Sequence, residues 1–190
     1  MAVYTKINQK EINIINKNFN IDKITSFKGI KQGIENTNYL LKSKKKKYIL
    51  TIFEKRVLQK EIPFFMKLMD NLNNSKINCP KPLKTKENKY LIKLKNKTAC
   101  IVSFLEGKDK KILNINDCYV IGKTIARMHV VTNKMKLNRK NSMGIRNLKP
   151  LLESIKFKSK KFSNLKVFLK NNLKDINRNW PKQLPKGIIH

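Results

Sequence analysis

The sequence predicts an α+β fold in which a small antiparallel sheet with one packed helix is followed by a mainly helical half. Residues 24–53 hold three short apolar segments, separated by a glycine-bearing turn and a lysine run. A continuous apolar segment at 98–104 ends shortly before Gly107, and beyond it apolar residues recur at helical spacing. The chain of 190 residues is long enough to bury a core, as one domain or as two small lobes.

The first half is expected to contain a helix, three strands and a second helix. Apolar residues at helical spacing predict the first helix over 9–19, and strands are expected at 24–28, 38–41 and 48–53. Pro63 suits the first turn of the second helix. That helix should pack on one face of the sheet through an apolar stripe formed by Ile62, Phe65, Met66, Met69 and Leu72.

The pattern changes from strands to helices near Gly107. Further strands are expected at 83–85, 89–94 and 98–104, and helices at 116–131, 148–155 and 164–180. Asn116 or Asp117 could cap the first of these helices, and Pro150 either breaks or begins the next. The last residues, 184–190, are expected to be extended. We therefore place the domain boundary between a sheet domain, 1–105, and a helical domain, 106–190.

The net charge of +32 first suggests a nucleic-acid-binding protein, because Lys and Arg release counterions from phosphates. Only five of the 44 basic residues are arginine, however, and base-edge recognition favours arginine. The lysines are also spread through the whole chain. A basic nucleic-acid-binding protein therefore stays the alternative from another functional class, and we expect no specific nucleic-acid partner.

The composition also bears on the compartment. Three cysteines without a CxxC spacing support neither a disulfide framework nor a zinc site. No apolar run is long enough to span a membrane, and the first residues lack the apolar centre of a signal peptide. We expect a cytoplasmic protein with no membrane partner and no metal site of its own.

The turn between the first two strands is a candidate lid over a nucleotide. It contains Gly29 and Gly33, followed by Glu35, Asn36 and Thr37. Glycines let the backbone turn tightly and approach a ligand, and the N–H groups of such a turn can bind phosphate. The alternative is an ordinary surface hairpin, which the same spacing also permits.

Eight segments, in order, resemble the bacterial homoserine kinases of the aminoglycoside phosphotransferase and choline kinase-like superfamily. They cover the whole chain and are MAVYTKI, SFKGIKQGIENTNYLL, YILTIFEKRV, IPFFMKLMDNL, NCPKPL, IVSFLEGK, IGKTIARMH and WPKQLPKGIIH. The resemblance implies a protein-kinase-like fold, with an antiparallel N-lobe that binds the nucleotide and the start of a helical C-lobe. It also implies transfer of the γ-phosphoryl group of ATP, with Mg²⁺, to the side-chain hydroxyl of L-homoserine in threonine biosynthesis.

By this resemblance, eight residues would bind the nucleotide. Gly29, Gly33, Thr37 and Asn38 would cover the phosphates, whereas Ser103 and Leu105 would present backbone groups to adenine. The superfamily's phosphate-binding Lys or Arg on the third strand is replaced by Thr51, so Lys55 is the predicted cation. Glu61 is its predicted partner, and Glu54 competes for that role. Another small-molecule kinase of the superfamily, acting on an aminoglycoside or choline, is the alternative function.

His190 resembles the first residue of the superfamily's catalytic loop, H-x-D-x-x-x-x-N. The catalytic Asp, the Asn and the later metal-binding Asp of that pattern would follow His190, so no catalytic residue is expected within the chain. The resemblance therefore implies the front part of a kinase. Apolar surface on its helices would be left for a complementary C-terminal chain or for self-association.

We accordingly expect the isolated 190-residue chain to show no phosphotransferase activity. The measurement is ATP turnover by the purified chain, compared with a variant in which Lys55 and Glu61 are both substituted. Turnover above that of the double variant would contradict this expectation.

Overall fold

The computed structural model describes residues 3–54, 57–141, 144–155, 162–181, 183 and 187–188. They divide into two compact units, one ending at Leu137 and one beginning at Asn138. The first unit contains a sheet with α1 (Gln9–Asn18), α2 (Ile62–Asn74) and α3 (Ile115–Asn133), and the second contains α4 (Ile145–Ser154) and α5 (Ser163–Asn179). The functional boundary expected after residue 105 stays a prediction.

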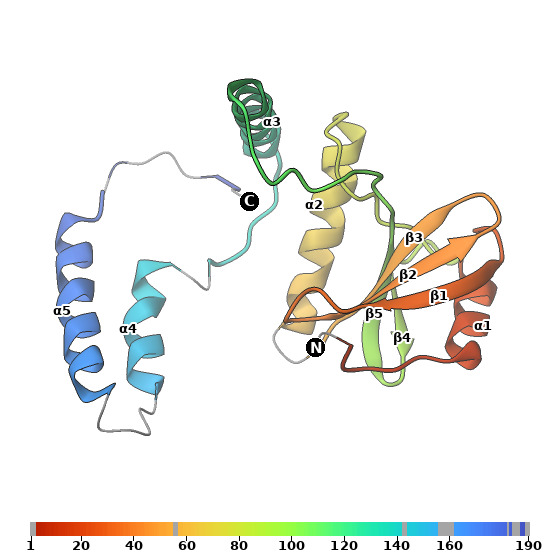
Figure 1. Cartoon of the computed structure of the whole chain (residues 1–190), viewed down its shortest axis with the longest axis horizontal. Helices are drawn as coiled ribbons and strands as arrows, with labels where there is room; N and C mark the ends of the chain where they lie inside the picture. The colour runs from red at the N-terminus through yellow and green to blue at the C-terminus, as the bar shows by residue number, and fades with distance from the viewer. Residues whose placement is uncertain are drawn as a thin grey trace. The chain divides into compact units, whose positions relative to one another are not determined.

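Five antiparallel strands form the sheet of the first unit, in the spatial order β1-β2-β3-β5-β4 (Figure 1). Their bounds are β1 (Ile24–Ile30), β2 (Thr37–Ser43), β3 (Lys47–Ile52), β4 (Leu91–Leu94) and β5 (Lys97–Ser103). The predicted strands at 24–53, 89–94 and 98–104 are confirmed, with ends shifted by up to two residues. A short 3-10 helix, η1 (Gln59–Glu61), precedes α2.

The strand predicted at 83–85 is wrong. Only isolated bridges form there, from Pro82 to Val102 and from Thr85 to Phe19. Two backbone bonds to β5 flank Pro82, from Ser103 N to the Lys81 carbonyl at 2.8 Å and from Leu83 N to the Ile101 carbonyl at 2.9 Å. Beyond Leu83 the pairing with β5 ends, because Thr85 N donates to the Lys89 carbonyl at 2.7 Å instead.

Helix α1 covers one face of the sheet, as its sequence predicts. Asn8 caps its N-terminus in a capping box with Glu11, which satisfies backbone donors at the helix start. Ile12, Ile15 and Phe19 are each at most 1% exposed. They join a core with inward residues of all five strands, among them Ile24, Tyr39, Leu41, Leu50, Ile52, Leu94 and Ile101.

Helix α2 covers the opposite face, which confirms its predicted packing. Ile62 and Met66 are buried against Cys100 and Val102, and Phe65 and Met69 pack around this second core. Leu72, the last residue of the predicted stripe, is also buried. The Tyr90 hydroxyl donates to Asp70 of α2 at 2.8 Å. Burial, together with this bond and the Asp70 charge, raises the pKa of Tyr90 to about 12.

The N-cap of helix α3 lies two or three residues before the expected caps, Asn116 and Asp117. It is Asn114, whose side chain accepts from Asp117 N at 2.8 Å, while the Asp117 carboxylate accepts from Asn114 N at 2.9 Å. The expectation that Asn116 or Asp117 is the N-cap is therefore wrong, because Asp117 closes a capping box from the third helical position. Large apolar side chains of α3 are exposed, including Ile115, Tyr119, Val120 and Ile121.

Two packed helices make up the second unit. The helices predicted at 148–155 and 164–180 are confirmed as α4 and α5, which pack against each other (Figure 1). Pro150 neither begins nor ends α4 but lies inside it. The extended segment predicted at 184–190 lies outside the described residues except at 187–188. No described helix has the length and apolarity that a membrane span would need.

The N-terminal residues 3–7, which we call the strap, cross the α1 side of β1 and β2. The Tyr39 hydroxyl accepts from Ile7 N at 3.2 Å and donates to the Thr5 carbonyl at 3.1 Å. Beneath the strap lies Gly29, where a Cβ atom would stand 2.9 Å from Val3 Cγ2. A side chain at position 29 would therefore displace the strap.

Replacing Gly29 by alanine should lower the free energy of unfolding by about 1–2 kcal/mol, because overpacking forces the stiff Val3 side chain and the strap to move. Gly107→Ala is the matched control, since nothing lies within 4 Å of its added Cβ. That variant should be neutral or stabilised by up to about 1 kcal/mol, through the lower entropy of its unfolded chain. Urea denaturation measures both, and equal stabilities would contradict the packing role of Gly29.

Candidate nucleotide-binding site

The turn between β1 and β2, residues 31–36, is the predicted phosphate-binding loop, and we call it the glycine loop. Gly33 has φ = +100°, which L side chains rarely adopt, and no atom lies within 4 Å of the position of its missing Cβ. Residues 31–35 are exposed. The loop is therefore open to solvent and shaped so that its backbone can approach a ligand.

Gly29 lies in β1, before the loop, and faces the strap. Its predicted phosphate contact stays a prediction, but the structure supplies a different reason for glycine at this position, the close approach of Val3. Of the two predicted glycines, only Gly33 lies in the loop itself.

Thr37, the first residue of β2, is fully buried. Its hydroxyl accepts from the backbone N–H groups of Tyr4, at 3.0 Å, and Thr5, at 3.1 Å, and donates to Glu54 Oε1 at 2.7 Å. These three bonds exhaust the capacity of a hydroxyl, which has one hydrogen and two lone pairs. The Thr37 side chain thus supports the loop from the α1 side of the sheet.

Asn38 faces the other side of the sheet, toward α2, because successive strand residues alternate. Thr51 of β3 lies opposite it, and the Thr51 hydroxyl donates to Asn38 Oδ1 at 2.8 Å. This bond holds the amide group in place and leaves its NH₂ group as a donor. Thr51 thereby orients Asn38, and its predicted place at the superfamily's cation position stays a prediction.

Glu54 follows β3, and its carboxylate is the centre of a polar network. The carboxylate accepts from Thr5 Oγ1 and Thr37 Oγ1, each at 2.7 Å, and pairs with Lys97 of β5. Its side chain is 9% exposed. Burial alone would raise the pKa of Glu54, but the hydrogen bonds from Lys97, Thr5 and Thr37 and the Lys97 charge outweigh it and lower the pKa.

The predicted pair of Lys55 and Glu61 is only partly described. Lys55 lies outside the described residues, so its role stays a prediction. Glu61 precedes α2 as its N-cap residue, is half-buried, and donates its backbone N–H to the Leu58 carbonyl at 2.8 Å. Its competitor Glu54 is held by Lys97, and the pairing of Glu61 with Lys55 stays a prediction.

The predicted adenine-binding segment follows β5. Ser103 exchanges two bonds with Lys81, from Ser103 N to the Lys81 carbonyl at 2.8 Å and from Lys81 N to Ser103 Oγ at 2.9 Å. Phe104 N donates to the Lys47 carbonyl at 3.3 Å. Among the described residues, none forms a hydrogen bond with the backbone of Leu105, so this residue offers the accessible backbone groups of the segment.

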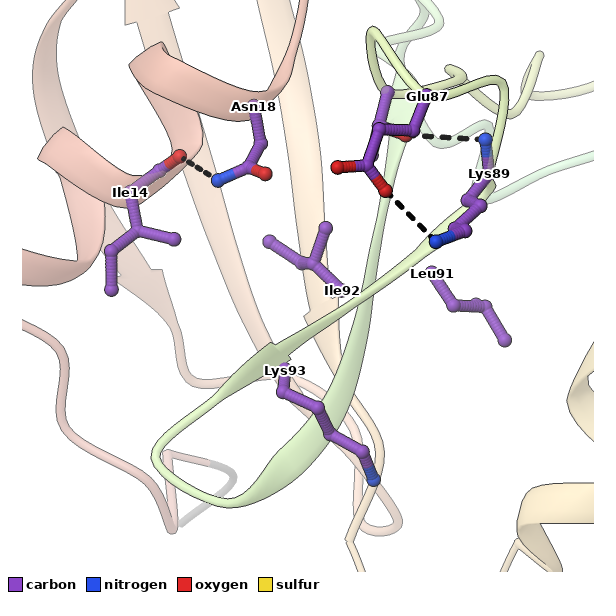
Figure 2. A pocket seen from close by; sticks show the side chains of 8 residues that line it. Ile14, Asn18, Glu87, Lys89, Leu91, Ile92 and Lys93 are labelled. Carbon is purple, nitrogen blue, oxygen red and sulfur yellow. Dashed lines mark hydrogen bonds and ion pairs between the residues drawn. The ribbon is translucent and has the colours of Figure 1, made fainter.

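One hollow lies away from these residues, between α1 and β4 (Figure 2). Ile14 and Asn18 line it from α1, and the Glu87–Lys89 ion pair, 2.8 Å, lines it from the loop before β4. Because β4 and β1 are opposite edges of the sheet, this hollow of about 220 Å³ is not the predicted nucleotide site. A second hollow lies between the ends of α2 and α3 and is lined by Asn71, Asn74, Ser75, Val131, Lys134 and Met135.

Sequence reasoning missed the strap residues Tyr4 and Thr5 and the partner of Glu54, Lys97. Thr5 and Lys97 are 92 positions apart in the chain, and their contact depends on tertiary structure alone. The one sequence feature that pointed to this network was Glu54 directly after an apolar strand. A carboxylate that is buried at such a position must have hydrogen-bonding or charged partners.

The fold is a protein-kinase-like α+β fold. A spectinomycin phosphotransferase, solved with ADP and spectinomycin, matches with a TM-score of 0.57 at 19% identity, over 92% of this chain and 56% of that one. An aminoglycoside phosphotransferase from Alicyclobacillus acidocaldarius matches with a TM-score of 0.57 at 10% identity, over 93% of this chain and 55% of that one.

The chain belongs to the phosphotransferase enzyme family, whose model matches residues 26–190. Its relatives include homoserine kinases from Paramagnetospirillum magneticum, 37% identical, and Rhizobium meliloti, 36% identical. Both match over 100% of this chain and 59% of the relative. The chain thus spans about three fifths of the length of the curated relatives it matches.

Because of the Glu54 network, the free energy of unfolding should depend on pH in the acidic range. A carboxyl with a lowered folded-state pKa stabilises the fold above its unfolded pKa, near 4.5, and loses that contribution as pH falls through the folded value. Glu54→Gln should cost about 1–3 kcal/mol at neutral pH, the range for hydrogen bonds to charged groups, and should flatten the dependence below pH 4.5.

The matched control is Glu106→Gln, because Glu106 also pairs with a lysine, Lys47, but its side chain is 74% exposed. Its stability and acid dependence should stay close to those of the parent. Urea unfolding at pH values from 3 to 7 measures both variants, and equal curves for them would contradict the role of Glu54.

Proposed function

We propose that the protein carrying this chain is a homoserine kinase, which transfers the γ-phosphoryl group of ATP to the side-chain hydroxyl of L-homoserine. The observation that carries the proposal is whole-chain identity of 32–37% with several proteins named homoserine kinase. Membership of the phosphotransferase enzyme family supports the reaction class.

The nucleotide would bind on the α2 side of the sheet, at the glycine loop. Backbone N–H groups around Gly33 would contact phosphate oxygens, and the NH₂ group of Asn38 would donate to the same ligand from the α2 face of the sheet. Leu105 would offer its backbone to adenine. Lys55, oriented by Glu61, would neutralise phosphate charge, which such reactions require.

Magnesium would supply further neutralisation of the phosphates when it is bound. In the described part of the chain, no group of three or more His, Cys, Asp or Glu side chains could hold a metal ion. We therefore assign none of the described residues as a magnesium ligand, and we derive no step through the metal. The contribution proposed for this chain is to bind and orient the nucleotide.

Another acceptor alcohol is the second candidate. Structures with the same fold include the spectinomycin phosphotransferase and an aminopropanol kinase, which matches with a TM-score of 0.58 at 12% identity. The described residues of the candidate site concern the nucleotide alone, so they do not discriminate among acceptors. Sequence identity with the homoserine kinases favours homoserine over these alternatives.

A coupled assay of ADP formation by the protein that carries this chain tests the proposal, with homoserine, choline and an aminoglycoside as acceptors. Homoserine should support the highest kcat/KM. Lys55→Ala should lower kcat/KM by about 10²-fold, in the range found when one group that stabilises transition-state charge is removed. Lys60→Ala, at an exposed position nearby, is the control and should leave kcat/KM close to that of the parent.

Turnover with choline or the aminoglycoside, but not with homoserine, would show that homoserine is the wrong acceptor, while the assignment to ATP-dependent phosphotransferases would stand. An absence of ATP turnover with all three acceptors would overturn the kinase proposal for these substrates.

A further inference from the structure

The strap contacts the glycine loop through an exposed side chain. Tyr4 is 56% exposed, yet its hydroxyl donates to the Ile34 carbonyl at 3.0 Å. Ile34 lies next to Gly33, in the open part of the loop. Because Tyr4 adds little to either core, this bond has its main effect on the position of the loop.

The strap also holds Thr37, the residue that directly follows the loop. The backbone N–H groups of Tyr4 and Thr5 both donate to the buried Thr37 hydroxyl. Two backbone donors thus converge on one side chain at the start of β2. A shift of the strap would require Thr37 to shift with it, or would leave buried donors without acceptors.

Glu54 connects this assembly to the end of β3. Its carboxylate accepts from Thr5 and Thr37, and its backbone N–H donates to Asn36 Oδ1 at 3.3 Å. The last loop residue and the first residue of β2 are thereby joined to the position just before Lys55. The loop is therefore joined to Glu54 at two points, through Asn36 to its backbone and through Thr37 to its carboxylate.

We propose that the strap is a positioning element for the glycine loop: Tyr4, with Thr5 acting through Thr37 and Glu54, holds the loop in its nucleotide-binding conformation. The inference rests on the proposed function, because it assigns the loop to a nucleoside triphosphate. A loop that is already ordered loses less conformational entropy when the ligand binds. The strap therefore raises affinity for the nucleotide without contacting it.

The first test measures kinetics in the protein that carries this chain, with Tyr4→Phe, which removes only the hydroxyl. The KM for ATP should rise about 2–10-fold, the equivalent of one hydrogen bond, while the acceptor KM stays within about 2-fold. Tyr119→Phe is the matched control, because Tyr119 is also exposed, at 64%, and lies on α3 away from the loop. It should leave both constants unchanged.

Thr37 supplies a second pair of variants. Thr37→Val keeps the shape but removes the hydroxyl, so it should raise the KM for ATP by at least as much as Tyr4→Phe. Thr37→Ser retains the hydroxyl and should restore most of the parent's KM for ATP. A role in stability alone would not change the ATP constant selectively, and parallel changes in both substrate constants would overturn the inference.

The second test does not depend on turnover. Hydrogen exchange of the amides at 31–36, measured without nucleotide, should accelerate about 2–10-fold in Tyr4→Phe and not in Tyr119→Phe. Titration calorimetry with ATP should show the same fold loss of affinity. If the parent lacks kinase activity, the proposed function fails, but hydrogen exchange and ATP affinity still test the role of the strap. If Tyr4→Phe leaves both the exchange rates and the ATP affinity unchanged, the proposed role of the strap is wrong.

Discussion

The buried carboxylate of Glu54 is the constraint on which the sheet unit depends. A carboxylate removed from water must be compensated by charge and hydrogen bonds, or it destabilises the fold. Here Lys97 supplies the charge, and Thr5 and Thr37 supply the donors. These partners come from the strap, β2 and β5, so satisfying one carboxylate brings together three segments that are distant in sequence. The glycine loop is held at this point because Thr37 and Asn36 belong to the same assembly.

The two faces of the sheet separate support from binding. Side chains on the α1 face, such as Thr37 and Tyr39, are buried and use their polar groups to hold the strap. On the α2 face, Thr51 orients Asn38, whose amide is a donor toward the side proposed for the nucleotide. Because successive side chains of a strand point to opposite faces of the sheet, neighbouring residues of one motif contact different partners. Thr37 and Asn38 belong to one motif, yet Thr37 supports the loop and Asn38 is the candidate nucleotide contact.

Most of the fold could be predicted from the sequence because periodicity directly reflects burial. The stripe beginning at Ile62 and the apolar strand ending at Ser103 were placed correctly for that reason. Of the predicted site, the openness of the loop at Gly33 follows from local sequence, because backbone conformation is a local property. The Glu54 network does not, since Lys97 has no local feature that sets it apart from the other lysines. The strand expected at 83–85 failed because a local pattern cannot show that Thr85 bonds to Lys89 rather than to β5.

In a chain with 44 basic and 12 acidic residues, acidic partners determine what each lysine does. Lys97 shows this, because its ammonium group is engaged by Glu54 and Thr5 on the α1 face and is thereby withdrawn from a role at the phosphates. Lys47 is likewise engaged by Glu106 beside Phe104. The carboxylates of Asp70 and Asp117 accept from Tyr90 and from the α3 cap. Glu54 is engaged in the same way. The pair of Lys55 and Glu61 stays a prediction that rests on the family resemblance.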